Sequence, residues 1–167
     1  DLPVHVDLSI GGDAIHPEAP NNRAFDWEIG DAAAAQDAIN GAAHVVTTQV
    51  LDNRVIVNAM EPRGCYAEVT AGKLNVAVNG QGVWVTHSDL MRHFGLSSDG
   101  VRVTNPDTGG GLGMKAMRYP ETFCTAFAAR ALRRPVRWMS ERTEAMLSDN
   151  AGRDLTTTAT LGFDADH

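Results

Sequence analysis

Four glycines fall within five positions at residues 109–113, where the sequence reads Gly-Gly-Gly-Leu-Gly. Glycine has no Cβ and adopts positive φ, so such a run turns tightly and leaves main-chain N–H groups open to a ligand. Residues 101–104 before it are rich in β-branched side chains, and Tyr119-Pro120-Glu121 after it is typical of a helix start. The run predicts a strand-to-helix loop, which either contacts a ligand or is a tight connection without one.

The remaining pattern predicts a single domain of mixed α+β class, a mixed sheet with packed helices. A helix cap is expected at Asp31, a second at Ser88, and a partial capping box at Ser140 and Thr143. We expect residues 1–22, with their prolines and paired asparagines, to form an extended linker, and residues 23–167 to form the domain. The helices are expected at residues 32–39, 88–94, 119–131 and from 140, and the strands at 44–51, 65–70, 74–78, 101–104, 136–139 and 155–162, with a hairpin turn at 71–72.

Composition narrows the functional classes. A hydrophobic fraction of 43%, a charged fraction of 21% and a net charge of −7 fit a globular protein and argue against nucleic-acid binding. The longest apolar window, residues 123–132, is too short to span a bilayer. Cys65 and Cys124 have no metal-ligand spacing, which indicates a reduced, cytoplasmic setting, with the periplasm as an alternative. The chain begins without a methionine or a signal peptide, so we expect a fragment of a longer protein.

Two familiar phosphate-binding loops do not fit the glycine run. A Walker loop requires Gly-Lys-Ser/Thr, but here Lys115 follows Met114 and precedes Ala116. The dinucleotide fingerprint requires a glycine at its sixth position, which counted from Gly109 is Met114. The ligand must therefore be sought in another class.

Several segments together resemble one family, the molybdenum hydroxylases of the xanthine dehydrogenase, aldehyde oxidase and carbon monoxide dehydrogenase superfamily. Residues 105–115, Asn-Pro-Asp-Thr-Gly-Gly-Gly-Leu-Gly-Met-Lys, are similar to that family's Pro-Asp-x-Gly-Gly-Gly-Phe-Gly-x-Lys segment. The resemblance covers nearly the whole chain and follows the aldehyde and carbon monoxide branch. The other matching segments are 16–22, 60–64 (Met-Glu-Pro-Arg-Gly), 134–138 with 141–142, and 151–154.

The resemblance implies a truncated, N-terminal portion of the molybdopterin-binding domain of a large subunit. It implies cofactor contact at Gly110, Gly111, Leu112 and Gly113, and at Gln81, for which a solvent-facing position at a strand end is the alternative. The implied cofactor is molybdopterin with molybdenum, in the cytosine dinucleotide form, and the implied partners are subunits or domains that carry a 2Fe-2S cluster and FAD. The implied substrate is a small molecule, an aldehyde, carbon monoxide or a heterocycle.

The chain departs from the family at three places. Leu112 replaces the usual phenylalanine, so an apolar wall remains without an aromatic face. Ala116 stands where purine-hydroxylating relatives have a substrate-binding glutamate, which argues against a purine substrate. No glutamine lies between Leu51 and Met60, where relatives have one near the molybdenum; either Gln49 takes that place from a shifted register or the contact is absent.

No residue of this chain matches the family's catalytic base or a metal ligand. Glu61 is expected to bond local backbone, and the histidines to be surface or satisfied residues: His44, His87 and His93. We therefore expect the isolated fragment to be inactive, to bind no molybdenum tightly and to self-associate through exposed apolar surface. The alternative is a stand-alone binding or scaffold module that keeps the fold without the chemistry.

Overall fold

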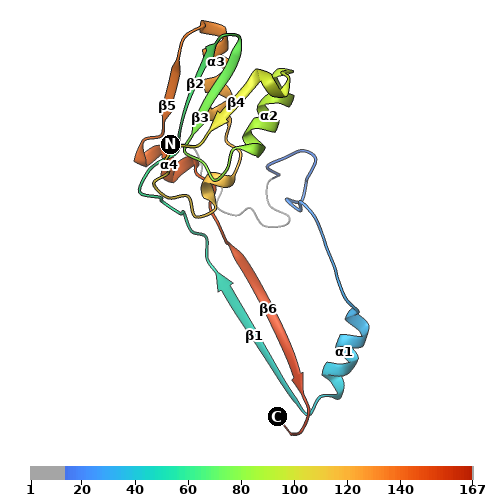
Figure 1. The fold of residues 1–167 in the computed structure, drawn as a ribbon. Helices are drawn as coiled ribbons and strands as arrows, with labels where there is room; N and C mark the ends of the chain where they lie inside the picture. Colours follow the sequence, from blue (N-terminus) through green and yellow to red (C-terminus); the bar gives the residue numbers. More distant parts are fainter. Residues whose placement is uncertain (1–13, 167) are drawn as a thin grey trace. The chain divides into compact units, whose positions relative to one another are not determined.

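The computed structural model describes residues 14–166 and confirms the mixed α+β class (Figure 1). The described chain separates into two compact units, one with the residues up to Thr48 and from Ala159 onward, the other comprising Gln49–Thr158. The α-helices are α1 (Ala32–Gly41), α2 (Trp84–Phe94), α3 (Pro120–Leu132) and α4 (Arg142–Ser148), with short 3-10 helices η1 (Ser98–Gly100) and η2 (Met114–Ala116). The strands are β1 (His44–Asp52), β2 (Gly64–Thr70), β3 (Lys73–Val78), β4 (Val101–Thr104), β5 (Val136–Met139) and β6 (Leu155–Phe163).

The larger unit is built on a four-stranded sheet with the order β4-β3-β2-β5. The predicted hairpin joins β2 to β3, and its turn places Ala71 and Gly72 at φ +51° and +77°. β5 pairs with β2 antiparallel, whereas β4 pairs with β3 parallel. A parallel pair needs a crossover, which α2 provides here. The sheet is therefore mixed, as the sequence predicts.

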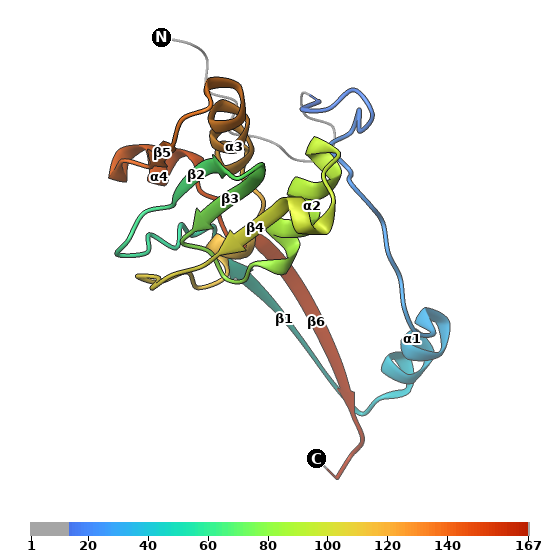
Figure 2. The ribbon, with the colours of Figure 1, turned by 45° about the horizontal axis from the view of Figure 1, so that its top comes forward.

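One face of this sheet carries the hydrophobic core. Side chains alternate along β2 and β3, so that Cys65, Ala67, Leu74 and Val76 lie on the same buried face. Leu90 of α2 and Ala126 and Ala129 of α3 complete the core on that face, and Figures 1 and 2 show both helices beside the sheet. The buried members of the core are Cys65, Ala67, Leu74, Val76, Val78, Leu90, Val101, Ala126 and Ala129.

Within residues 14–166, a second sheet pairs β1 with β6. All residues of β6 and all residues of β1 except Asp52 are exposed. The Thr47 and Thr160 hydroxyls lie 3.0 Å apart across the pair. At Gly162 an added Cβ would lie 2.9 Å from the Cβ of Ala42, so a glycine allows the segment after α1 to approach β6 closely.

The linker predicted for residues 1–22 is only partly visible, because residues 1–13 lie outside the described residues. Residues 14–22 contain no helix or strand. They form two successive turns, in which Ala19 N donates to His16 O and Asn22 N donates to Ala19 O, at 2.9 and 2.8 Å. The boundary at residue 22 stays a prediction.

Two helix starts differ from the sequence-based expectation. The helix expected to begin at Ser88 begins at Trp84, after Val83, which provides no side-chain cap. A start without a capping side chain gives no sequence signal of the usual kind. At α4 the capping box is formed by Glu141 and Glu144 rather than by Ser140 and Thr143. The predicted cap of α1 is confirmed, since Asp31 Oδ1 accepts from Ala34 N at 2.9 Å.

Candidate functional site

The glycine run forms the loop between β4 and η2, and its backbone adopts conformations that explain part of its composition. Gly110 and Gly113 have φ values of +99° and +93°, where L side chains are strained. Leu112 has φ +51°, in the left-handed region, and its side chain is 79% exposed. The loop is thus bent at three of its positions, and its apolar side chain points away from the protein core.

The other two glycines have close neighbours. A Cβ added at Gly109 would lie 2.6 Å from the Cβ of Glu61, and one at Gly111 would lie 2.6 Å from Oε1 of Gln81. Real Cβ atoms do not approach other atoms this closely. Three of the glycines therefore have a reason within the protein itself, Gly110 and Gly113 from backbone conformation and Gly109 from the Glu61 Cβ, whereas the neighbour of Gly111 is the end of a flexible side chain.

Glu61 holds the loop at two points. Its Oε2 accepts hydrogen bonds from Gly109 N at 2.8 Å and from Lys115 Nζ at 2.9 Å, and its own N–H donates to Gly109 O at 3.1 Å. Burial acts to raise the pKa of the Glu61 carboxyl, but the hydrogen bonds from Lys115 and Gly109 lower that pKa below its usual 4.5. Glu61 does bond backbone, but the expectation of a local partner is wrong, because Gly109 lies 48 residues away in the sequence.

Gln81 holds the loop at a third point. Its Oε1 accepts from Gly113 N at 2.9 Å. Gln81 does not end a strand, because β3 stops at Val78. Gln81 is exposed and its Oε1 also contacts the loop, so the solvent-facing alternative stays open and cofactor contact at Gln81 stays a prediction.

Three consecutive N–H groups lie between these tethers, those of Gly110, Gly111 and Leu112. Among residues 14–166, none of the three donates a hydrogen bond to a protein acceptor. Backbone N–H groups in folded proteins almost always have a partner, which is either another protein group, water or a ligand. This segment, residues 110–112, is here called the open arc.

The segment before Glu61 is fixed by the first residue of α4. Arg142 Nη1 donates to Asn58 Oδ1 and to Ala59 O at 2.6 and 2.7 Å, and Nη2 donates to Met60 O at 2.7 Å. Ala59 in turn lies below the loop, since a Cβ at Gly110 would come within 3.5 Å of the Ala59 Cβ. The support of the loop therefore extends through residues 58–61 to α4.

The segment after Glu61 is fixed by a buried arginine. Arg63 is 4% exposed and forms ion pairs with Asp149 at 2.5 Å and Glu121 at 3.0 Å. Its guanidinium carbon lies 3.6 Å from the ring centroid of Tyr119 and 5.3 Å from that of Trp138. Burial acts to lower the pKa of Arg63, but its two carboxylate partners raise it. This residue ties the start of β2 to α3 and to the end of α4.

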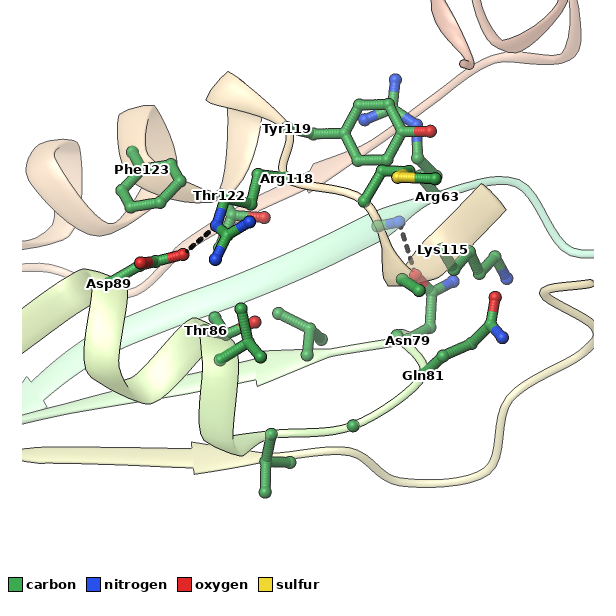
Figure 3. Close-up of a pocket in the computed structure, with 18 of the residues that line it drawn as sticks. Arg63, Asn79, Gln81, Thr86, Asp89, Lys115, Arg118, Tyr119, Thr122 and Phe123 are labelled. Carbon is green, nitrogen blue, oxygen red and sulfur yellow. Dashed lines mark hydrogen bonds and ion pairs between the residues drawn. The ribbon is translucent and has the colours of Figure 1, made fainter. Parts of the chain in front are cut away.

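A pocket of about 340 Å³ adjoins the tethered side of the loop (Figure 3). Gln81, Asn79 and Lys115 lie at one end of it, and Asp89, Arg118 and Phe123 lie at the other. The buried Asp89 carboxylate is paired with Arg118 and Arg92. Gln81 and Lys115 therefore take part both in holding the loop and in lining the pocket.

The histidines described between residues 14 and 166 have structural partners where their contacts are recorded. His87 Nε2 lies 3.2 Å from Ser98 O, and His93 packs edge-on against Phe94 and Phe123, which confirms both as satisfied residues. In the described part of the chain, no three His, Cys, Asp or Glu side chains gather as metal ligands. None of the helices described between residues 14 and 166 is both long and apolar enough to cross a membrane.

Comparison with known proteins identifies the family. The molybdopterin cofactor-binding domain family matches residues 15–167, and the chain belongs to this family. The carbon monoxide dehydrogenase large chain of Hydrogenophaga pseudoflava is 29% identical over 92% of this chain and 21% of its own length. The nicotine 6-hydroxylase large subunit of Paenarthrobacter nicotinovorans is 33% identical over 83% of this chain and 17% of its own length.

Solved structures of similar proteins agree with this assignment. A Cu,Mo-CO dehydrogenase superposes with a TM-score of 0.81 and 28% identity, over 85% of this chain and 18% of its own. Quinoline 2-oxidoreductase from Pseudomonas putida 86 gives a TM-score of 0.73 with 30% identity, over 78% and 17% of the two chains. The chain thus spans about a fifth of the length of the relatives it matches.

The sequence predicts the loop and Gln81 as site residues, but it does not predict the residues that support them. Lys115, Arg142 and Arg63 were recognised only as parts of matching segments, without a partner. These residues stand out because they are charged and buried or paired in the fold. Burial and pairing of this kind cannot be read from the sequence. Asn105 was missed too: its side chain exchanges two hydrogen bonds with the Gly80 backbone, at 3.0 and 2.9 Å, where the loop begins.

Proposed function

We propose that this chain forms the loop-bearing half of a molybdopterin site in the large subunit of a molybdenum-dependent hydroxylase. The observation that carries the proposal is the open arc, with three consecutive N–H donors in a loop that the protein holds by both ends. A pyranopterin dinucleotide offers amide-like edges, a pyrophosphate and a metal-oxo group, all of which accept such hydrogen bonds. The donor set proposed for this cofactor is the N–H groups of the exposed Gly110 and Leu112, with that of the buried Gly111 between them.

The five expected contact residues take different roles in this proposal. Gly110, Gly111 and Leu112 donate their N–H groups to the cofactor. Gly113 shapes the loop instead, since its N–H already donates to Gln81. Gln81 keeps its Nε2 side for the cofactor while its Oε1 holds the loop.

The bound cofactor would supply the oxidation–reduction chemistry, in which oxygen derived from water enters a carbon centre and electrons leave through partner subunits. We propose the cytosine dinucleotide form, with 2Fe-2S and FAD carried by those partners, and a cytoplasmic location. The substrate is proposed to be a small aldehyde, carbon monoxide or a heterocycle other than a purine. Relatives named for carbon monoxide, nicotine and quinoline support this range.

The test of the proposed function is metal and pterin analysis of the full-length protein, followed by assays with aldehydes, carbon monoxide and N-heterocycles. We expect about one molybdenum and one pterin per large subunit. A full-length protein that contains neither would contradict the proposal and favour the scaffold alternative. The 167-residue chain alone is expected to show no hydroxylase activity and to self-associate, and stoichiometric molybdenum in it would overturn that expectation.

A substitution on the open arc tests the proposed contact directly. Leu112 is exposed and makes no core contact, so Leu112→Asp should leave folding intact. The added carboxylate would repel the cofactor's anionic groups, and we expect molybdenum and pterin content to fall at least roughly tenfold. Leu112→Phe, which introduces the usual family residue, is the matched control and should retain the cofactor. Equal cofactor content in the two variants would exclude contact at residue 112.

A further inference from the structure

The charged side chains of Glu61 and Lys115 join the two ends of the loop, and neither is expected to contact the cofactor. The Glu61 carboxylate binds Gly109 N before the open arc and Lys115 Nζ after it. The same oxygen, Oε2, accepts both bonds, at 2.8 and 2.9 Å. A single atom therefore fixes the distance between the two ends of the loop.

Burial makes this ion pair more than a surface contact. The Lys115 side chain is 1% exposed, and that of Glu61 is 30% exposed. A buried ammonium is costly unless it is paired, and the only carboxylate recorded within ion-pair distance of Lys115 in the described residues is Glu61. Loss of the pair would therefore favour movement of Lys115 toward solvent, together with the loop end that carries it.

The partner of the loop is itself rigidly placed. Arg142 fixes residues 58–60 immediately before Glu61, and the buried Arg63 lies two residues after it. Glu61 N also donates to Gly109 O at 3.1 Å. The carboxylate thus stands on a fixed segment and holds a loop that would otherwise be flexible because of its glycines.

We propose that Glu61 and Lys115 are positioning residues that set the open arc in its cofactor-binding shape before any cofactor is present. The inference rests on the proposed function, because the arc is what the pair positions. It goes beyond that function by assigning the shape of the arc to an ion pair outside the contact residues. The cofactor would then meet donors that are already aligned.

The test uses the full-length protein with the substitution Glu61→Gln. Glutamine keeps an oxygen acceptor for Gly109 N but removes the charge that holds Lys115. We expect amide hydrogen exchange in a peptide covering residues 109–117 of the cofactor-free protein to rise roughly tenfold or more, while peptides from β2 and β3 keep their wild-type protection. Molybdenum and pterin content should fall in parallel. Wild-type exchange in the loop peptide, with wild-type cofactor content, would overturn the proposal.

Lys115→Met serves as the second variant, because it leaves no unpaired buried cation and therefore folds even where Glu61→Gln does not. It should loosen residues 113–117 while Glu61 keeps its bond to Gly109 N. The matched control is Glu68→Gln, whose carboxylate binds the Tyr66 hydroxyl at 2.8 Å away from the loop and should change neither readout. If amide hydrogen exchange of the loop peptide in Lys115→Met stays at the wild-type rate, the proposal is also contradicted.

Failure of this inference can be told apart from failure of the proposed function. If the wild-type full-length protein contains molybdenum and pterin but both variants keep wild-type loop exchange and cofactor content, the positioning role is wrong and the function stands. If the wild-type protein contains no pterin, the proposed function is wrong, and with it the role of the pair in cofactor binding.

Discussion

Away from their shared turn, β2 and β3 alternate buried and half-buried residues, whereas β6 exposes every residue along its length. The β2–β3 pair has a buried face covered by α2 and α3. Next to it, Arg63 forms ion pairs with Glu121 and Asp149 inside the same unit. The β1–β6 pair leaves large apolar side chains exposed, among them Val50, Leu51 and Leu161. The difference indicates that the four-stranded sheet is stabilised by its own contacts, whereas the β1–β6 sheet needs surface from elsewhere, such as the rest of a longer protein.

The largest expected effect comes from breaking the ion pairs of the four-stranded sheet. Arg63→Met removes the cation that balances the buried Asp149 and the partly buried Glu121. We expect a loss of roughly 3–5 kcal/mol in the free energy of unfolding, since removal of one partner leaves an uncompensated buried charge. Urea unfolding followed by circular dichroism measures it. A loss as small as that for the exposed Arg54→Met would refute the central role of Arg63.

A smaller effect is expected within the loop. In Gly109→Ala the new Cβ would lie 2.6 Å from the Glu61 Cβ, so one backbone must shift. We expect a destabilisation of about 1–3 kcal/mol, as for overpacking in a core. Gly41→Ala in α1, where nothing lies within 4 Å of the added Cβ, is the matched control. The midpoints of thermal unfolding of the two variants give the comparison. Equal midpoints would mean that the loop accommodates the added Cβ without a loss of stability.

Acid should weaken the four-stranded unit in a predictable direction. Burial acts to raise the pKa of Glu121, but its bonds to Arg63 lower it, and Glu61 is lowered in the same way. A carboxylate with a lowered folded-state pKa contributes stability above its unfolded pKa, near 4.5, and loses it as the pH falls through the folded value. Unfolding free energies measured from pH 7 to pH 3 should decline, and Glu121→Gln should flatten the decline. An unchanged slope in that variant would contradict the assignment.

The smallest effect sharpens the contrast between the two sheets by a matched pair of substitutions. Thr160→Val in β6 removes an exposed hydroxyl contact with Thr47 and should change stability by less than about 0.5 kcal/mol. Thr125→Val in α3 removes a buried hydroxyl that accepts from Cys65 Sγ at 3.3 Å, and should cost about 1 kcal/mol. Urea unfolding of both variants gives the comparison. If the exposed substitution costs more, the β1–β6 sheet is better supported than its exposure suggests.

Local patterns were sufficient for most of the fold. The Ala71-Gly72 turn, the Asp31 cap and the proline at the start of α3 act over a few residues, and each was predicted correctly. The start of α2 was missed because Val83 caps nothing, and the Glu141–Glu144 box was missed because serine is the commoner cap.

The site was predictable only in part, for a related reason. The run of glycines is enough to predict where the loop lies. The reason for a glycine at residue 109 is its close approach to Glu61, which is 48 residues away in the sequence. A close approach between distant residues leaves no periodicity in the sequence. The same holds for Lys115, whose burial and partner follow from tertiary packing alone.

The bonds that hold the glycine loop affect the step at which its conformational entropy is lost. A run with four glycines has many accessible backbone states in the unfolded chain, and restricting them costs roughly 1–2 kcal/mol per residue. In this protein the bonds from Glu61 and Gln81 restrict the run as the chain folds. The entropy cost of ordering the loop is then part of the free energy of folding. A ligand that binds afterwards meets N–H donors that are already ordered, so its binding free energy contains little of this cost.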